Sequence, residues 1–92
     1  MTGKKPVIYN KTMTLAATEY SQQLAMGTTK FLVQCRGDYD VQLAFVTGES
    51  STNYITLKAG QVYYEDNVDI GHTLYFQCAT AAQVVEIIAW EN

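Results

Sequence analysis

The sequence predicts a single all-β domain, an antiparallel β-sandwich or jelly-roll-like barrel of about seven to eight short strands. Runs of alternating apolar and polar residues recur at intervals of about ten residues, which is the spacing of short strands. Glycine or small polar residues separate these runs, and no segment longer than one turn has the period of a helix. With 92 residues, of which 48% are hydrophobic, the chain is long enough for one core and too short for a second domain.

Residues 1–11 differ in composition from the rest of the chain. They combine glycine, proline and three lysines with one short apolar patch, Val7 to Tyr9. We therefore expect an extended, mobile N-terminal arm that becomes ordered only against a partner, followed by the β-sandwich domain at residues 12–92. An edge strand of the same domain is an equally good interpretation of the arm.

The first half of the domain contains three predicted strands. Thr12 to Ala17 alternates strictly, whereas residues 18–29 have little periodicity and fit a loop or a short irregular strand. Lys30 to Cys35 and Val41 to Val46 alternate again, and the turn at Gly37-Asp38 between them predicts that they are neighbours in one sheet. The side chains expected to face the core are those of Met13, Leu15, Ala17, Phe31, Val33, Cys35, Val41, Leu43 and Phe45.

The stretch from Tyr54 to Asn67 predicts a β-hairpin. It contains two alternating runs on either side of a turn at Ala59-Gly60. When the alternation is continued through this turn, Val62 and Tyr64 face the core, and Tyr63 lies on the opposite, exposed face.

The last two predicted strands are Thr73 to Ala79 and Val84 to Trp90. The first alternates, whereas the second is apolar on both faces around a single Glu86. Such a pattern is typical of a central strand or of a strand that something else covers. The side chains expected to face the core are Leu74, Phe76, Cys78, Val85, Ile87 and Ala89, and those of Tyr75 and Gln77 are expected to face away.

The sequence contains no recognisable catalytic machinery. Its one histidine, His72, lies in an acidic loop, and neither the serines nor Cys35 and Cys78 occur in a nucleophile motif. Two cysteines are too few for a disulfide framework, so we expect buried thiols rather than a native disulfide. The oxygen ligands within residues 65–69 lack the spacing of an EF-hand, which favours a solvated turn over a calcium site. We therefore expect neither an enzyme nor a metal or cofactor site.

The charge distribution separates the arm from the body. From Thr12 onward the chain has 3 basic and 9 acidic residues, so its net charge is 3 − 9 = −6. Nucleic-acid binding requires clustered lysine and arginine, and it is therefore not expected. No apolar run reaches the roughly 18 residues of a membrane span, and residues 1–11 lack the apolar core of a signal peptide. We expect synthesis in a cytosol and no membrane partner.

The aromatic residues predict a contact surface. The chain has seven tyrosines and one tryptophan, and outward-facing tyrosines beside amides favour a protein interface. Stacking on a sugar and tyrosines that are simply half covered are the alternatives. The arm is suited to add a strand to a neighbouring sheet while its lysines meet an acidic surface. The candidate interface residues are Lys4, Lys5, Val7, Ile8, Tyr9, Lys11, Tyr63, Tyr75, Gln77 and Trp90.

Four segments follow one another in a recognisable order: TMTLAATEYSQQL, GTTKFLVQCRGDYDVQLAFVTG, YITLKAGQVYYEDN and TLYFQCATAAQVVEIIAW. From Thr12 to Trp90 the chain resembles a group of small structural proteins encoded by tailed bacteriophages. The positions that carry the resemblance are Phe31, Gln34, Arg36, Gly37, Asp40, Phe45, Gly48, Tyr54, Leu57, Gly60, Tyr63, Tyr75, Gln83, Glu86 and Trp90.

This resemblance implies a virion component, assembled in the cytoplasm of a host bacterium. The preferred role is a decoration or cement protein that binds the major capsid protein on the exterior of the head and stabilises the shell. The alternative is a tail or fibre accessory module that binds a host-surface carbohydrate or another virion protein. Either role implies a homo-oligomer, for which a trimer is favoured.

Overall fold

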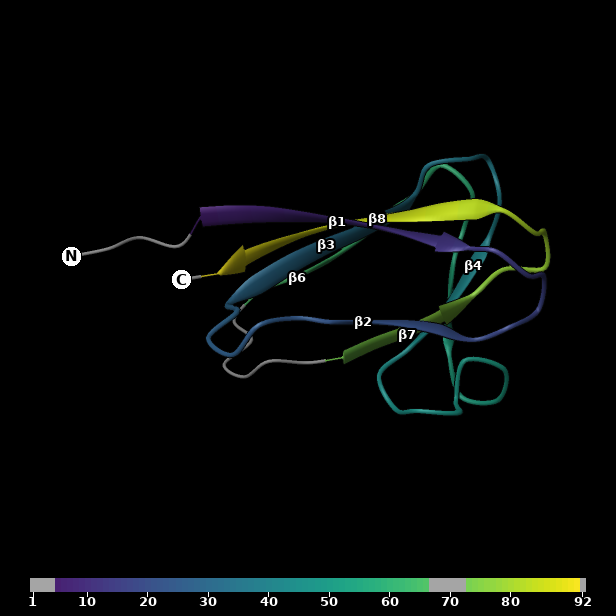
Figure 1. Cartoon of the computed structure of the whole chain (residues 1–92), viewed down its shortest axis with the longest axis horizontal. Coiled ribbons are helices and arrows are strands. Elements are labelled where there is room, and N and C mark those ends of the chain that lie inside the picture. Colours follow the sequence, from purple (N-terminus) through teal and green to yellow (C-terminus); the bar gives the residue numbers. More distant parts are fainter. Residues whose placement is uncertain (1–4, 67–72, 92) are drawn as a thin grey trace.

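The computed structural model describes residues 5–66 and 73–91, and these residues form eight strands and no helix. The strands are β1 (Lys5–Met13), β2 (Tyr20–Gln23), β3 (Lys30–Cys35), β4 (Val41–Ala44), β5 (Ile55–Leu57), β6 (Val62–Glu65), β7 (Thr73–Gln77) and β8 (Gln83–Glu91). They build two antiparallel sheets, sheet A in the order β1-β8-β3-β6 and sheet B in the order β2-β7-β4-β5, which form two layers in Figure 1. This strand order is that of an eight-stranded jelly roll, so the predicted all-β sandwich is confirmed.

The core lies between the two sheets. Alternate residues of each strand point into it, because successive side chains of a strand leave on opposite faces. The predicted inward faces of the last two strands are confirmed, and β8 is a central strand, between β1 and β3. The buried apolar side chains are Met13, Leu24, Phe31, Val33, Val41, Leu43, Ala44, Leu57, Leu74, Phe76, Cys78, Val85, Ile87 and Ala89.

Residues 5–11 are part of the sandwich. As strand β1 they pair with β8 along their whole length, from Lys5 opposite Glu91 to Met13 opposite Gln83. The expectation of a mobile arm at residues 1–11 is therefore wrong for the part that the structure describes, and the edge-strand interpretation is right. The physical reason is that β8 is central and needs hydrogen-bond partners on both sides, which the arm supplies on one of them. Lys4 lies outside the described residues.

The predicted strand from Thr12 to Ala17 is wrong beyond Met13, where β1 ends. Leu15 is 61% exposed, and Ala17 has a positive φ of 51°, because the chain turns there towards sheet B. The turn is fixed by two backbone hydrogen bonds of 2.8 Å, one from the Ala17 amide to the Cys78 carbonyl and one from the Ala82 amide to the Met13 carbonyl. The short irregular strand expected within residues 18–29 is confirmed as β2.

The predicted hairpin from Tyr54 to Asn67 is wrong. β5 pairs with β4 in sheet B and β6 pairs with β3 in sheet A, so the turn at Gly60 carries the chain from one sheet to the other. Gly60 has a φ of 80°, a conformation that favours glycine. A glycine is therefore suited to this connection between sheets just as it is to a hairpin turn. Because the chain changes sheets here, the alternation does not continue across the turn.

The faces of β6 are consequently the reverse of those predicted. Val62 and Tyr64 are 46% and 50% exposed, whereas Tyr63 points inward. The Tyr63 ring lies 6.0 Å from that of Phe31 and 6.1 Å from that of Phe45, measured between centroids.

The predicted neighbours β3 and β4 also lie in different sheets. The chain crosses from sheet A to sheet B between Cys35 and Val41, and β3 pairs instead with β6 and β8. The residues Gly37-Asp38 suit a crossing as well as a hairpin turn, which is why the sequence did not separate the two. β4 ends at Ala44, and Phe45, expected in the core, is 43% exposed at the end of the sandwich.

Candidate functional site

The outer face of sheet A carries an apolar row that runs across all four strands. The strand registers place Ile8 opposite Ile88, Ile88 opposite Leu32, and Leu32 opposite Tyr64. Residues opposite one another in a sheet share a face, so these four side chains, here called the apolar row, form one line. Ile8 is 66% and Tyr64 is 50% exposed, while Leu32 and Ile88 are half-buried. No described strand covers this face.

A second line of side chains lies beside the apolar row, towards the start of β3. It consists of Pro6, Trp90 and Lys30, which are opposite one another in the register. The Lys30 ammonium group lies 4.7 Å from the centroid of the Trp90 ring, so it occupies one face of that ring as a cation–π contact.

The line on the other side of the apolar row is polar. The Glu86 carboxylate accepts hydrogen bonds of 2.8 Å from the Gln34 amide nitrogen and from Nε of Arg36. These bonds, with that from Arg36 the stronger cause, hold the pKa of Glu86 below its ordinary value. The Glu86 carboxylate is therefore an ionised group at neutral pH that is already paired with Gln34 and Arg36.

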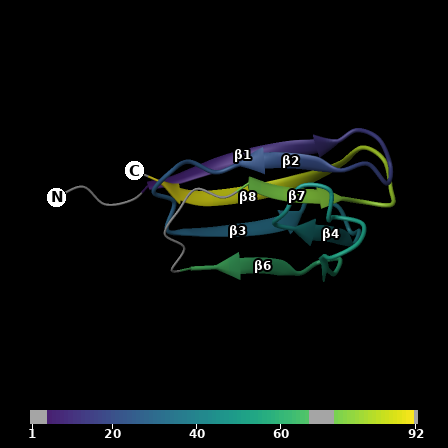
Figure 2. The same cartoon turned by 90° about the horizontal axis from the view of Figure 1, so that it is seen from below.

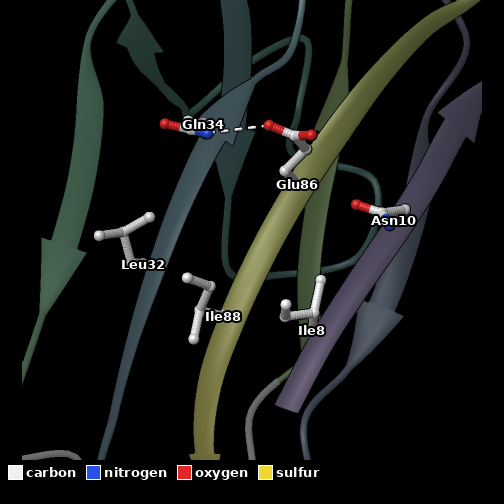
Figure 3. Close-up of a pocket in the computed structure, with 6 residues that line it drawn as sticks. All are labelled: Ile8, Asn10, Leu32, Gln34, Glu86 and Ile88. Carbon is white, nitrogen blue, oxygen red and sulfur yellow. Dashed lines mark hydrogen bonds between the residues drawn. The ribbon is translucent and has the colours of Figure 1, made fainter. Parts of the chain in front are cut away.

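A groove of about 310 Å³ opens between the apolar row and the polar line of Glu86, as Figure 3 shows. Ile8, Ile88 and Leu32 lie at one end of it, and the Gln34–Glu86 pair and Asn10 lie at the other. An apolar centre beside hydrogen-bonded polar groups is the composition of a protein-binding surface. The groove contains no nucleophile, and its one carboxylate is neutralised by Arg36. The arrangement is therefore suited to binding a partner.

Of the predicted interface residues that the structure describes, only Ile8 and Trp90 lie together on this face. Lys5 is exposed at the start of β1, and Val7, Tyr9 and Lys11 occupy the opposite, half-buried side of that strand. The Tyr9 hydroxyl donates a 2.7 Å hydrogen bond to the buried carboxylate of Glu91, and this bond raises the pKa of Tyr9. Tyr9 therefore ties β1 to β8 and is not free to bind a partner.

Tyr63 does not belong to the surface either. Burial, followed by a 2.7 Å hydrogen bond from its hydroxyl to the Glu65 carboxylate, raises its pKa to about 12. The prediction of an exposed Tyr63 is wrong because the chain changes sheets before β6.

Tyr75 and Gln77 lie on the outer face of sheet B, on the far side of the molecule. Gln77 is only 6% exposed, contrary to expectation, because the loop between β4 and β5 covers it and its amide donates to the Ser50 hydroxyl. That loop is held by Glu19, whose carboxylate accepts from the Gly48 and Ser50 amides and from the Ser50 hydroxyl. The hydrogen bond from the Ser50 hydroxyl is the main cause that lowers the pKa of Glu19.

Leu32, Ile88, Tyr64 and Val62 belong to this face but were not among the predicted interface residues. One signal for two of them was present, because β8 is apolar on both faces and Leu32 alternates with inward-facing Phe31 and Val33. Tyr64 and Val62 were assigned to the core, and only the crossing at Gly60 reveals their true face.

The described residues contain no cluster of three or more histidine, cysteine or acidic side chains that could hold a metal ion. The predicted acidic turn falls partly outside them, since Asn67, Asp69 and His72 lie in the segment that the structure does not describe. Cys35 and Cys78 are free thiols, and burial raises the pKa of Cys35. No helix capable of spanning a membrane is found among the residues described.

Comparison with known proteins supports the fold alone. No protein-family model and no curated protein matches the sequence. Among solved structures, the chain is similar to the solution NMR structure of a de novo designed double-stranded β-helix, with a TM-score of 0.56 and 15% sequence identity. The match covers 95% of this chain and 99% of the designed one. At this identity the similarity shows the shared arrangement of strands and carries no information about function.

Proposed function

We propose that this chain is a non-enzymatic structural protein of a tailed-phage virion, which docks on another virion protein through the outer face of sheet A. The preferred partner is the major capsid protein, with the chain bound on the exterior of the head as a decoration or cement protein. The observation that carries the proposal is the exposed apolar row of Ile8, Ile88, Leu32 and Tyr64. The virion assignment rests on the resemblance of the sequence.

Contact of a continuous apolar row with water is unfavourable. Burying exposed apolar surface contributes about 25 cal/mol of favourable free energy per Å². A complex in which a partner covers Ile8 and Tyr64 is therefore stabilised by this contact. A scattered apolar side chain needs no such explanation, but a row aligned across four strands is contiguous. The Glu86–Arg36 pair and Lys30 flank the row and limit the orientations in which a partner fits.

The alternative function is that of a tail or fibre accessory module that binds a carbohydrate. Trp90 on the same face favours it, since tryptophan rings stack on sugars. The Lys30 ammonium group already occupies one face of that ring, so that face is not free to stack on a sugar. This observation makes protein docking the better supported of the two.

Co-sedimentation with undecorated phage heads tests the proposal. We expect the wild-type chain to pellet with the heads and Ile8→Lys to bind at least tenfold more weakly. Ile55→Lys is the matched control, because Ile55 is an exposed isoleucine on an edge strand of sheet B and is 43% exposed. Failure of the wild-type chain to bind any shell, or equal losses in both variants, contradicts docking through sheet A. A glycan-array signal that Trp90→Ala abolishes would instead support the carbohydrate alternative.

A further inference from the structure

The four edge strands of the two sheets differ in how well they are protected. An edge strand exposes unpaired backbone N–H and C=O groups, and proline, lysine or short length keeps other chains from pairing with it. β1 contains Pro6, Lys5 and Lys11, and β5 has only three residues. β2 is polar at three of its four positions.

β6 lacks proline and lysine, and its one charged residue is Glu65 at its end. Its sequence is Val62-Tyr63-Tyr64-Glu65, which contains neither proline nor lysine and consists largely of residues that favour strands. One side of β6 pairs with β3, and no described strand lies on its other side, as Figure 2 shows at the border of sheet A. Val62 and Tyr64 stand exposed on the outer face at this open edge.

We propose that β6 pairs antiparallel with β6 of a second copy of this chain, so that two sheets A join into one continuous eight-stranded sheet. A two-fold axis perpendicular to the sheet keeps the outer face of both copies on the same side. This requires residues of the same face to lie opposite one another. Two registers keep the faces aligned and pair three of the four β6 residues with each other: one is centred on Tyr63 and the other on Tyr64. We favour the one centred on Tyr63, which places Val62 opposite Tyr64 of the second copy, because the other places Val62 opposite the acidic Asp66.

A second copy suits this edge because the edge complements itself. Each Val62 meets a Tyr64, a β-branched residue against an aromatic one, which is a favourable cross-strand pair. In the same register Glu65 lies opposite Gln61, so no like charges are brought together. The pairing is isologous and closes at two copies, which prevents continued growth into a fibre. The pairing of β6 with itself depends on β6 alone and is independent of the proposed function.

The pairing also enlarges the docking surface, a step that does rest on the proposed function. The four strands of sheet A contain 9, 9, 6 and 4 residues, and at about 3.3 Å per residue and 4.8 Å between strands they give an outer face of roughly 450 Å². A stable interface usually buries about 800 Å² on each partner, so a single sheet face is small for this purpose. Two faces joined at β6 give roughly 900 Å² by the same estimate. The apolar row then continues from Tyr64 into Val62 of the second copy.

Sedimentation equilibrium of the full chain across a concentration series tests the pairing. We expect the mass to rise from one to two 10.3 kDa chains, and Val62→Lys to weaken the association at least tenfold. Ile55→Lys, at an edge of sheet B with nearly the same exposure, leaves the association unchanged. Ile8→Lys also leaves the association unchanged while it weakens docking at least tenfold, so the two proposals fail separately. A monomer at every concentration, or the mass of the expected trimer, overturns the pairing.

A cysteine experiment checks the register even if Val62→Lys does not fold. In a background with Cys35→Ala and Cys78→Ala, an equal mixture of Val62→Cys and Tyr64→Cys chains is expected to form a disulfide-linked heterodimer. The residues opposite one another have Cα atoms about 4.5–5.5 Å apart, within disulfide reach. Each variant alone places its two cysteines on a diagonal of about 7–8 Å and is expected to cross-link poorly. Equal cross-linking in all three samples contradicts this register.

Discussion

Two neighbouring isoleucines on β8 provide a direct test of the sandwich. Ile87 is fully buried between the sheets, whereas Ile88 is half-buried on the outer face of sheet A and lines the groove. The substitutions Ile87→Ala and Ile88→Ala remove the same three carbon atoms from adjacent positions of the same strand. Any difference in the free energy of unfolding therefore reports the environment of the side chain, because local propensity is the same at both positions.

The structure gives different magnitudes for the two variants. Ile87→Ala leaves a cavity in a closed core and is expected to cost about 3–5 kcal/mol, the upper part of the range for this substitution. Ile88 lines a groove that is open to solvent, so Ile88→Ala leaves no closed cavity. Its cost is only the free energy of transferring the removed carbon atoms out of water. At about 0.8 kcal/mol for each buried CH₂, three partly covered carbons give about 1–2 kcal/mol. A chain of 92 residues has a stability of about 5–14 kcal/mol, so Ile88→Ala remains folded without denaturant, whereas Ile87→Ala removes between about a fifth and all of the stability.

Urea unfolding, followed by circular dichroism and by the fluorescence of the single tryptophan, measures both values. With a slope of about 1.5 kcal/mol per M, the midpoint should fall by about 2–3 M for Ile87→Ala and by about 1 M for Ile88→Ala. Binding to phage heads should show the reverse order, with Ile88→Ala the weaker binder. Equal losses of stability would refute the assignment of the two faces, and with it the exposed apolar row.

Two further predictions concern the ends of the sandwich and its response to acid. Deletion of residues 1–11 removes Tyr9 and leaves the buried Glu91 carboxylate without its strongest hydrogen bond, so we expect a loss of at least about 3 kcal/mol, measured by thermal and urea unfolding. An unchanged melting curve would show that β1 is dispensable. Glu19 has a lowered pKa in the folded chain, so its contribution to stability is present above the ordinary pKa of 4.5 and disappears as the pH falls through the folded value. Glu19→Gln should therefore flatten the fall in melting temperature below pH 4.5, and an unaltered slope would contradict the role of its bonds to Ser50.

Alternation predicted most strands because one face of each is buried. Lys30 to Cys35 and Thr73 to Ala79 alternate cleanly, and their inward residues Phe31, Val33, Leu74 and Phe76 are all in the core. Thr12 to Ala17 alternates equally well and is mostly turn, since the left-handed conformation of Ala17 depends on a contact with Cys78 that is distant in sequence. Local pattern therefore predicts a strand only when a partner strand is present.

The connections between strands could not be predicted from the sequence, for a related reason. The residues of the Gly60 corner suit a hairpin and a crossing equally, and nothing local records which sheet the next strand will join. Because the Gly60 turn was predicted to be a hairpin, both faces of β6 were predicted the wrong way round. Tyr63 was expected on the surface, and it packs against the core. For the same reason Val62 and Tyr64 were expected in the core, whereas they are exposed and are the residues on which the proposed pairing depends.

The candidate site was predictable only in part. Ile8 and Trp90 were identified from the apolar patch in the arm and from the doubly apolar last strand. The row that joins Ile8 to Tyr64 depends on the registers of three strand pairs, and register is a property of the assembled sheet. The interaction of Gln77 with Ser50 depends likewise on a loop that folds over sheet B.

The position of β8 has a consequence for the order in which this chain folds. β8 follows every other strand in the sequence, yet it lies between β1 and β3, and β1 has no other partner in sheet A. During synthesis β1 therefore has no partner in sheet A until β8 has left the ribosome. Pairing strands so distant in sequence is slow, because the entropy of closing the long intervening loop is lost before any contact compensates for it. We expect the pairing of β8 with β1 and β3 to be a late step of folding, which completes sheet A.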